Sequence, residues 1–280
     1  MKVLKFGGTS VGSAVAIRSV REILVNQEGR IIAVFSALSG TTDLLSRLLL
    51  LASEKNKEYE SVIEEIKERH LSLAGVLLDS DSYDGYLRSL NRHISQLNGI
   101  LEGIFRLGEV TIRSTDLALS FGELMSLDLM EPVLKEYIPD VSCIDARDII
   151  FTKPLNGLER LDYISSEKAI RLKLSELSRV TITSGFISTS GKGYASTLGR
   201  GGSDHTAAII AAATGAEMLE IWTDVSGIYT ANPAIVADAF PIAGLTYAEA
   251  LEVSHFGAKV IYPPSIETVM KREIDRKSVV

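Results

Sequence analysis

The sequence has few of the residues from which disulfides and metal centres are built. It contains a single cysteine, Cys143, which excludes an intrachain disulfide and a cysteine metal cluster. The residues around Cys143 predict a strand, so we expect a buried and unreactive thiol. Four histidines are spread along the chain, at His70, His93, His205 and His255. Their spacing is not that of metal ligands, and packing or surface roles are expected. The scarcity of cysteine fits a reducing, cytoplasmic compartment.

Long apolar segments are also missing. No run is long enough to cross a bilayer, and the start Met1–Lys5 lacks the hydrophobic region of a signal peptide. The formal net charge of −7 disfavours a nucleic-acid surface. We therefore expect neither a membrane nor a nucleic acid as partner. With 280 residues, 46% of them hydrophobic, the chain fits one large α/β domain or two small ones.

Two common nucleotide-binding patterns are absent as well. The chain has no Gly-x4-Gly-Lys-Ser/Thr loop, and no Gly-x-Gly-x-x-Gly comes after its first predicted strand. The second absence argues against a dinucleotide cofactor. The strand leads instead into Gly7-Gly8, with Lys5 just before them. Glycine amides there would hold phosphate, and the ammonium group would neutralise it.

The order of elements predicts a parallel sheet. Lys2–Phe6 reads as a buried strand, followed by a small-residue turn and an amphipathic helix that includes Val15 and Leu24. Arg30–Phe35 is an almost continuous apolar strand, and it runs through Ser36–Thr42 into a second helix. Two successive strand–turn–helix units are typical of βαβ folds.

Residues 53–136 differ from the segment before them and predict a largely helical insertion. Glu109, Asp116 and Glu123 recur there at intervals of seven and share one stripe. A solvent-facing stripe explains this spacing, and a functional Glu123 is the less favoured alternative. Strands resume at Val141–Asp145.

The last part of the chain contains further turns at strand ends. Val180–Ser184 predicts a strand, Phe186–Thr197 a hairpin or flap, and Glu217–Thr223 another strand. The turn-rich segment after Asp224 includes Tyr229. In open α/β sheets ligands bind outside the carboxyl ends of strands, where these turns lie. From the pattern alone, Thr223-Asp224 is equally explained as an ordinary strand end, and Tyr229 as a packed aromatic residue.

The stretch Ser196–Thr206 is the most distinctive in the chain. Its three glycines allow a ligand to approach the backbone, and Ser203 or Asp204 is suited to cap the helix that begins there. Arg200 adds a planar donor fork for a carboxylate or phosphate. These features predict an anion site at a helix N-terminus, although a simple connection has the same pattern. Together with Lys5 and Lys259, they favour phosphoryl transfer.

Six motifs, in order along the chain, resemble those of the aspartokinases in the amino acid kinase family. They are Lys5-Phe-Gly-Gly-Thr-Ser10, Ser36-Ala-Leu-Ser-Gly-Thr-Thr42, Ser120-Phe-Gly-Glu123, Thr197-Leu-Gly-Arg-Gly-Gly-Ser-Asp204, Trp222-Thr-Asp-Val-Ser-Gly-Ile-Tyr229 and Phe256-Gly-Ala-Lys-Val260. The first and fourth are highly specific, and the six cover almost the whole chain.

This resemblance implies a three-layer αβα sandwich with a mainly parallel central sheet, the amino acid kinase or carbamate kinase-like fold, and a helical insertion at about 53–136. One catalytic domain would span 1–280, with a substrate-side lobe at about 1–195, a nucleotide-side lobe at about 196–280 and no ACT domain. The implied activity transfers the γ-phosphoryl group of ATP to the β-carboxylate of L-aspartate. This reaction gives 4-phospho-L-aspartate, the first step of lysine, threonine and methionine biosynthesis.

The resemblance also implies roles for individual residues. Lys5 would stabilise the transferred phosphoryl group, and Asp204 would organise the lysines. Substrate contacts would come from Ser36, Thr42, Glu123, Arg200, Gly201 and Ser203. Nucleotide contacts would come from Gly7, Gly8, Thr9, Ser10, Thr223, Asp224, Tyr229 and Lys259. Mg²⁺ would be held through the ATP phosphates and water, with no protein metal ligand.

The chain departs from the family pattern in two ways. Ala234 comes after Pro233 where family members often carry an arginine, so one nucleotide contact is not carried over. The usual regulatory ACT domains are also missing, which leaves open a truncated chain or a kinase without its own feedback module. The parent chain would then include ACT or homoserine dehydrogenase domains, and a homodimer is left open. Alternatives to aspartate kinase are a relative that phosphorylates another carboxylate, a carbamate or a nucleotide phosphate, and a non-catalytic amino-acid or nucleotide sensor.

Overall fold

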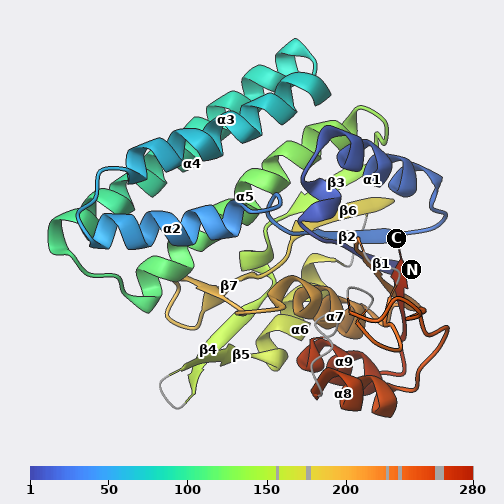
Figure 1. The fold of residues 1–280 in the computed structure, drawn as a ribbon. Helices are drawn as coiled ribbons and strands as arrows, with labels where there is room; N and C mark the ends of the chain where they lie inside the picture. Colours follow the sequence, from blue (N-terminus) through green and yellow to red (C-terminus); the bar gives the residue numbers. More distant parts are fainter. Residues whose placement is uncertain (156–157, 175–177, 225–226, 233–234, 256–261, 280) are drawn as a thin grey trace.

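A parallel sheet of six strands forms the centre of the molecule (Figure 1). The computed structural model describes residues 1–155, 158–174, 178–224, 227–232, 235–255 and 262–279. The strands of the sheet are β1 (Lys2–Phe6), β2 (Ile31–Phe35), β3 (Val141–Ile144), β6 (Val180–Ser184), β9 (Met218–Trp222) and β10 (Asp275–Val279). Their order is β10-β9-β1-β2-β6-β3, and every neighbouring pair is parallel. The predicted α/β class is confirmed.

Helices cover both faces of this sheet. They are α1 (Ala14–Asn26), α2 (Thr41–Ser53), α3 (Tyr59–Leu77), α4 (Ser80–Leu107), α5 (Ile112–Lys135), α6 (Tyr163–Lys173), α7 (Gly202–Thr214), α8 (Tyr247–His255) and α9 (Pro263–Met270). Figure 1 shows α1 and the C-terminal part of α5 on one face of the sheet and α7 on the other. The result is the expected three-layer sandwich. Among the described residues, no helix combines the length and the apolar character that a bilayer crossing demands.

The burial of the sheet explains why its strands could be predicted from sequence. All five residues of β2 are buried, as expected for a strand covered on both faces. On one face, α7 packs closely because the residues that it buries include Ala207, Ala208 and Ala211. Their small side chains let the helix approach β1, so the first turn of α7 lies near the carboxyl end of that strand.

The helical insertion is confirmed, with α3, α4 and α5 all inside the predicted range. Local signals determine its helix ends: Asp79 accepts a hydrogen bond from the Ser82 amide at 2.9 Å, and Gly108, with φ 72°, ends α4. The insertion contributes to the hydrophobic core, because α3 buries Val62, Ile63 and Ile66.

Several sequence-based expectations about exposure and helix starts were wrong. Val15, predicted to face the core, is 73% exposed. Glu109 precedes α5, so the three acidic residues do not share one helix, and Glu123 is buried instead of solvent-facing. Neither Ser203 nor Asp204 caps α7. Its N-cap is Gly201, whose left-handed φ of 71° turns the chain into the helix and leaves the Asp204 side chain available for another contact.

A smaller sheet of four strands lies beside the central one. It consists of β4 (Phe151–Leu155), β5 (Leu158–Leu161), β7 (Ile187–Ser190) and β8 (Ala195–Thr197) in the order β5-β4-β7-β8. β7 and β8 pair antiparallel, which confirms the predicted hairpin. Two 3₁₀ turns, Thr9–Val11 and Ala146–Asp148, complete the described elements. Residues Asp275–Val279 form β10 at the edge of the central sheet.

The first prediction tests whether the insertion is a packed part of the core. Leu97 in α4 is fully buried, whereas Leu107 at the end of the same helix is 79% exposed. We expect Leu97→Ala to lower the free energy of unfolding by about 2–5 kcal/mol, because it leaves a cavity. Leu107→Ala, the matched control, should change it by less than about 0.5 kcal/mol. Urea unfolding measures both values, and equal effects would contradict this packing.

Candidate active site

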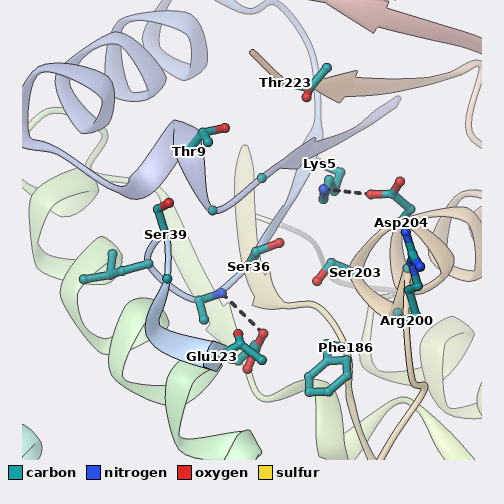
Figure 2. A pocket seen from close by; sticks show the side chains of 18 of the residues that line it. Lys5, Thr9, Ser36, Ser39, Glu123, Phe186, Arg200, Ser203, Asp204 and Thr223 are labelled. Carbon is teal, nitrogen blue, oxygen red and sulfur yellow. Dashed lines mark hydrogen bonds and ion pairs between the residues drawn. The ribbon is translucent and has the colours of Figure 1, made fainter. Parts of the chain in front are cut away.

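A cavity of about 530 Å³ opens at the carboxyl ends of the central strands (Figure 2). Most of the residues predicted to act in the site line it. They are Lys5, Gly7, Gly8, Thr9, Ser36, Thr42, Glu123, Arg200, Gly201, Ser203, Asp204 and Thr223. The tertiary structure therefore brings into one cavity residues from the first quarter, the middle and the last third of the chain.

Lys5 and Asp204 form an ion pair across the floor of this cavity. Lys5 lies in β1, in register with Val34 of β2 and Ile221 of β9. Its Nζ is 2.7 Å from the Asp204 carboxylate, and both side chains are largely buried. Asp204 lies in the first turn of α7, where the helix dipole stabilises a negative charge. The pair presents one ammonium group to the cavity in a defined position.

Small residues let the loops after β1 and β2 touch. A Cβ added at Gly8 would lie 3.1 Å from the Ala37 carbonyl oxygen, and one at Gly12 would lie 2.9 Å from Ser39 Cβ. The Ser39 amide donates a hydrogen bond to the Gly8 carbonyl at 3.1 Å. The glycines thus allow the backbone of the two loops to form one wall of the cavity, beside Lys5.

Glu123 places a buried carboxyl group in the opposite part of the cavity. It extends from α5, and its side chain is 3% exposed. Oε1 accepts a hydrogen bond from the Ala37 amide at 3.4 Å, while Oε2 is buried and has no hydrogen-bond partner in the part of the chain that the structure describes. Burial raises the pKa of this carboxyl to about 8, and the Ala37 hydrogen bond partly opposes the shift. Such a group favours a ligand that brings its own cation.

Arg200 supplies the complementary charge. It lies in the exposed turn before α7, and no ion pair or hydrogen bond joins its side chain to any described residue. Gly201 has two reasons to be glycine: its φ is 71°, and an added Cβ would lie 2.4 Å from Cγ of Tyr262. Figure 2 shows Arg200 and Glu123 on opposite sides of the cavity, with Ser203 between them and Ser36 above Glu123.

Phe186 completes the cavity and was not predicted to belong to it. Its φ of 65° is unusual for a bulky residue. Two hydrogen bonds hold this conformation: the Phe186 amide donates to Thr206 Oγ1 at 3.1 Å, and the Phe186 carbonyl accepts from the Leu198 amide at 2.8 Å. No local pattern predicts a left-handed phenylalanine. Ser39 and Asp43 also line the cavity without having been identified, although both lie in or next to the predicted Ser36–Thr42 turn.

Some predicted nucleotide residues lie outside the cavity lining. Ser10 is in the 3₁₀ turn, and Asp224 is exposed after β9, where its carboxylate accepts a hydrogen bond from Thr223 Oγ1 at 3.1 Å. Tyr229 pairs with Pro241 in a short bridge. Lys259 and the Pro233-Ala234 pair fall outside the described residues, so their predicted roles stay predictions.

The three histidines whose side chains the structure describes agree with packing roles, and Cys143, expected to be buried, is half-buried. Burial raises the pKa of the Cys143 thiol to about 12, which makes it a poor nucleophile at neutral pH. His70, His93 and His205 are buried, and burial lowers the pKa of both His70 and His205 to about 4. Within the described residues, no group of three or more His, Cys, Asp or Glu side chains is arranged to hold a metal ion.

Several known proteins are similar to this chain. A bifunctional aspartokinase/homoserine dehydrogenase of Daucus carota is 37% identical over 273 residues, which are 96% of this chain and 30% of that protein. The lysine-sensitive aspartokinase 3 of Escherichia coli (strain K12) is 34% identical over 97% of this chain and 60% of its own length. The chain thus spans about a third to three fifths of these relatives.

A solved structure gives the same relationship in three dimensions. The crystal structure of E. coli aspartokinase III in complex with aspartate and ADP superposes with a TM-score of 0.89 at 30% identity, covering 99% of this chain and 62% of that one. The family model for the amino acid kinase family matches residues 1–276. By its sequence and its fold, this chain belongs to the amino acid kinase family.

Proposed function

We propose that this chain is an aspartate kinase catalytic unit. It transfers the γ-phosphoryl group of ATP to the β-carboxylate of L-aspartate and forms 4-phospho-L-aspartate. One observation carries the proposal: a buried carboxyl oxygen of Glu123 and the guanidinium of Arg200, neither of which has a partner among the described residues, lie across one cavity. These two groups match the ammonium and the α-carboxylate of an amino acid.

The acceptor specificity is explained by these charges. Glu123 pairs with the ammonium group, and Arg200 binds the α-carboxylate through two parallel hydrogen bonds. Ser36, Thr42 and Ser203 orient the rest of the substrate. An acceptor that carries a phosphate in place of the ammonium group would be repelled by an ionised Glu123. The E. coli aspartokinase III structure, bound to aspartate and ADP, supports the same assignment.

Phosphoryl transfer then depends on position and charge. The β-carboxylate is already ionised at neutral pH, so it attacks the γ-phosphorus directly and needs no general base. Its oxygen forms the new O–P bond as the bond to the β–γ bridging oxygen of ATP breaks, and ADP leaves with that electron pair. Lys5 stabilises the charge on the transferred group, while Asp204 holds the ammonium group of Lys5 in place.

The nucleotide lies beside the glycines after β1. The amides of Gly7 and Gly8, with Thr9, Ser10 and Thr223, line the path of its phosphates. Asp224, Tyr229 and Lys259 are proposed to contact the rest of ATP. Mg²⁺ would neutralise phosphate charge and take its ligands from phosphate oxygens and water, since Asp204 is already paired with Lys5.

The wider setting of the chain is also part of the proposal. The reaction would be the first step of lysine, threonine and methionine biosynthesis. The parent protein would include further domains, as the bifunctional relatives do by name. A cytoplasmic location and a homodimer stay predictions.

The proposal predicts acceptor selectivity. With ATP and Mg²⁺, we expect acyl phosphate, trapped by hydroxylamine, from L-aspartate and little from glutamate or N-acetylglutamate. N-acetylglutamate has no ammonium group for Glu123, and glutamate is one methylene longer. The assay measures hydroxamate formation for each acceptor. Turnover with another acceptor but not with aspartate would refute the substrate assignment, and no turnover with any acceptor would favour a sensor.

The two cations of the cavity should have separable effects on kinetics. Lys5→Ala should mainly lower kcat, by roughly two orders of magnitude or more, because Lys5 acts on the transferred phosphoryl group. Arg200→Ala should mainly raise the aspartate KM by a roughly similar factor, because it leaves the substrate carboxylate unpaired. Steady-state kinetics with varied aspartate separate the two. Arg106→Ala, at an exposed position in α4, is the control, and an unchanged KM for Arg200→Ala would remove Arg200 from the site.

Aspartate binding should depend on pH through Glu123. With a pKa of about 8 in the free protein, its carboxyl is mostly protonated at pH 7, and a bound ammonium group favours the ionised form. Binding therefore releases a proton, and the aspartate KM should fall as pH rises from 6 to 8, by up to about tenfold per unit, and level off above 8. The measurement is KM against pH. Glu123→Gln should have a higher, flat KM, and a flat wild-type profile would contradict the assignment.

The same titration affects stability in the opposite direction. In the free protein, the native state keeps the Glu123 proton above the pH at which the unfolded chain loses it. The contribution of this group to the free energy of unfolding is therefore complete below its ordinary pKa of 4.5. It is lost progressively as pH rises from there to about 8.

A further inference from the structure

The two substrate-binding charges of the proposed site belong to different elements. Glu123 extends from α5, and Arg200 lies in the turn after β8. An amino acid that bridges them is bound well only when the distance between the two side chains matches the distance between its ammonium and carboxylate groups. Some contact between α5 and the β7–β8 hairpin must therefore hold the two elements in register.

Asp116 makes a contact of this kind. Its Oδ1 accepts a hydrogen bond from Thr197 Oγ1 at 2.8 Å, in a half-buried position. Burial raises the pKa of the Asp116 carboxyl, and the bond from Thr197 opposes that shift. Asp116 precedes Glu123 by seven residues, two turns of α5, so both side chains extend from nearly the same face. Thr197 precedes Arg200 by three residues.

A second contact joins the same two segments, α5 and the β7–β8 hairpin. The Arg113 guanidinium lies over the Tyr194 ring, 4.7 Å from its centroid. Along α5 the order is Arg113, Asp116 and then Glu123, and along the hairpin it is Tyr194, Thr197 and then Arg200. The two segments therefore run side by side in the same direction. Arg113 contacts Tyr194, Asp116 contacts Thr197, and the next residue of each series, Glu123 or Arg200, lines the cavity.

We propose that Asp116 is a positioning residue for the amino-acid substrate. Through Thr197 it holds the turn that carries Arg200 at a fixed distance from Glu123. The inference rests on the proposed function, because it assumes that one ligand spans these two charges. It predicts an effect on substrate binding and not on phosphoryl transfer, since Lys5 is held separately by Asp204.

The Thr197 side chain allows a direct test. Thr197→Val keeps the shape but removes the donor, and should raise the aspartate KM about tenfold, the usual worth of a hydrogen bond to a charged group. kcat and the KM for ATP should stay within about twofold. Thr197→Ser keeps the hydroxyl and should restore the aspartate KM. An unchanged KM in Thr197→Val, or an equal loss in kcat, would overturn the proposal.

A double-mutant cycle separates the pair from its surroundings. Asp116→Asn and Thr197→Val act on one contact, so the double variant should raise the aspartate KM no more than the larger single change. Glu109→Gln, the corresponding acid-to-amide substitution at an exposed residue outside α5, is the control and should have the wild-type KM. Additive effects on KM would assign the two residues independent roles and refute the coupling.

A readout that needs no turnover distinguishes this inference from the proposed function. Hydrogen exchange at the amides of residues 198–202 should be faster in Thr197→Val than in Thr197→Ser, because the turn has lost its tether. Equal exchange rates would overturn the role of Asp116 whatever the enzyme phosphorylates. If the wild type uses another amino acid in place of aspartate, the proposed function fails, and the same cycle on that acceptor's KM tests Asp116.

Discussion

The ion pair between Lys5 and Asp204 connects the two parts of the molecule that the proposed chemistry needs. β1 carries the lysine, α7 carries the aspartate, and the pair is 2.7 Å long. Because α7 buries small residues against the sheet, its first turn lies close enough to β1 for this contact. The helix dipole and the ammonium group both stabilise Asp204, so Lys5 is held at the cavity floor before a nucleotide arrives.

The rest of the cavity places opposite charges at a distance from that pair. Glu123 is buried with an unpartnered oxygen, and Arg200 is exposed and unpaired among the described residues. In the free protein, the cost of burying a charge keeps Glu123 protonated near neutral pH. A ligand with a cation at one end and a carboxylate at the other would give Glu123 a cation and Arg200 an anion to pair with. Substrate recognition is thus proposed to consist of two ion pairs, one at each end of the amino acid.

Much of the fold and part of the site could be predicted from local patterns. β2 is apolar along its whole length because both faces are covered, and the helical insertion was predicted because residues 53–136 change in character and show no strand pattern. The glycines of the strand-end turns were identified because close backbone approach requires them. Phe186 was missed, since tertiary hydrogen bonds hold its left-handed backbone. Asp116 and Glu123 were assigned to a solvent face, because sequence spacing does not reveal which neighbour covers a helix.

The sequence by itself determined the α/β class, the parallel order of strand and helix, and the residue types that the cavity contains. Those features depend on side-chain periodicity and on the conformational freedom of glycine, which are local properties. Only the tertiary structure decided that Lys5 pairs with Asp204, that Glu123 is buried without a full set of partners, and that Asp116 reaches Thr197. Each of these contacts joins segments that are far apart in the sequence and close in space. Burial and charge pairing depend on that spatial arrangement, which local sequence patterns do not specify.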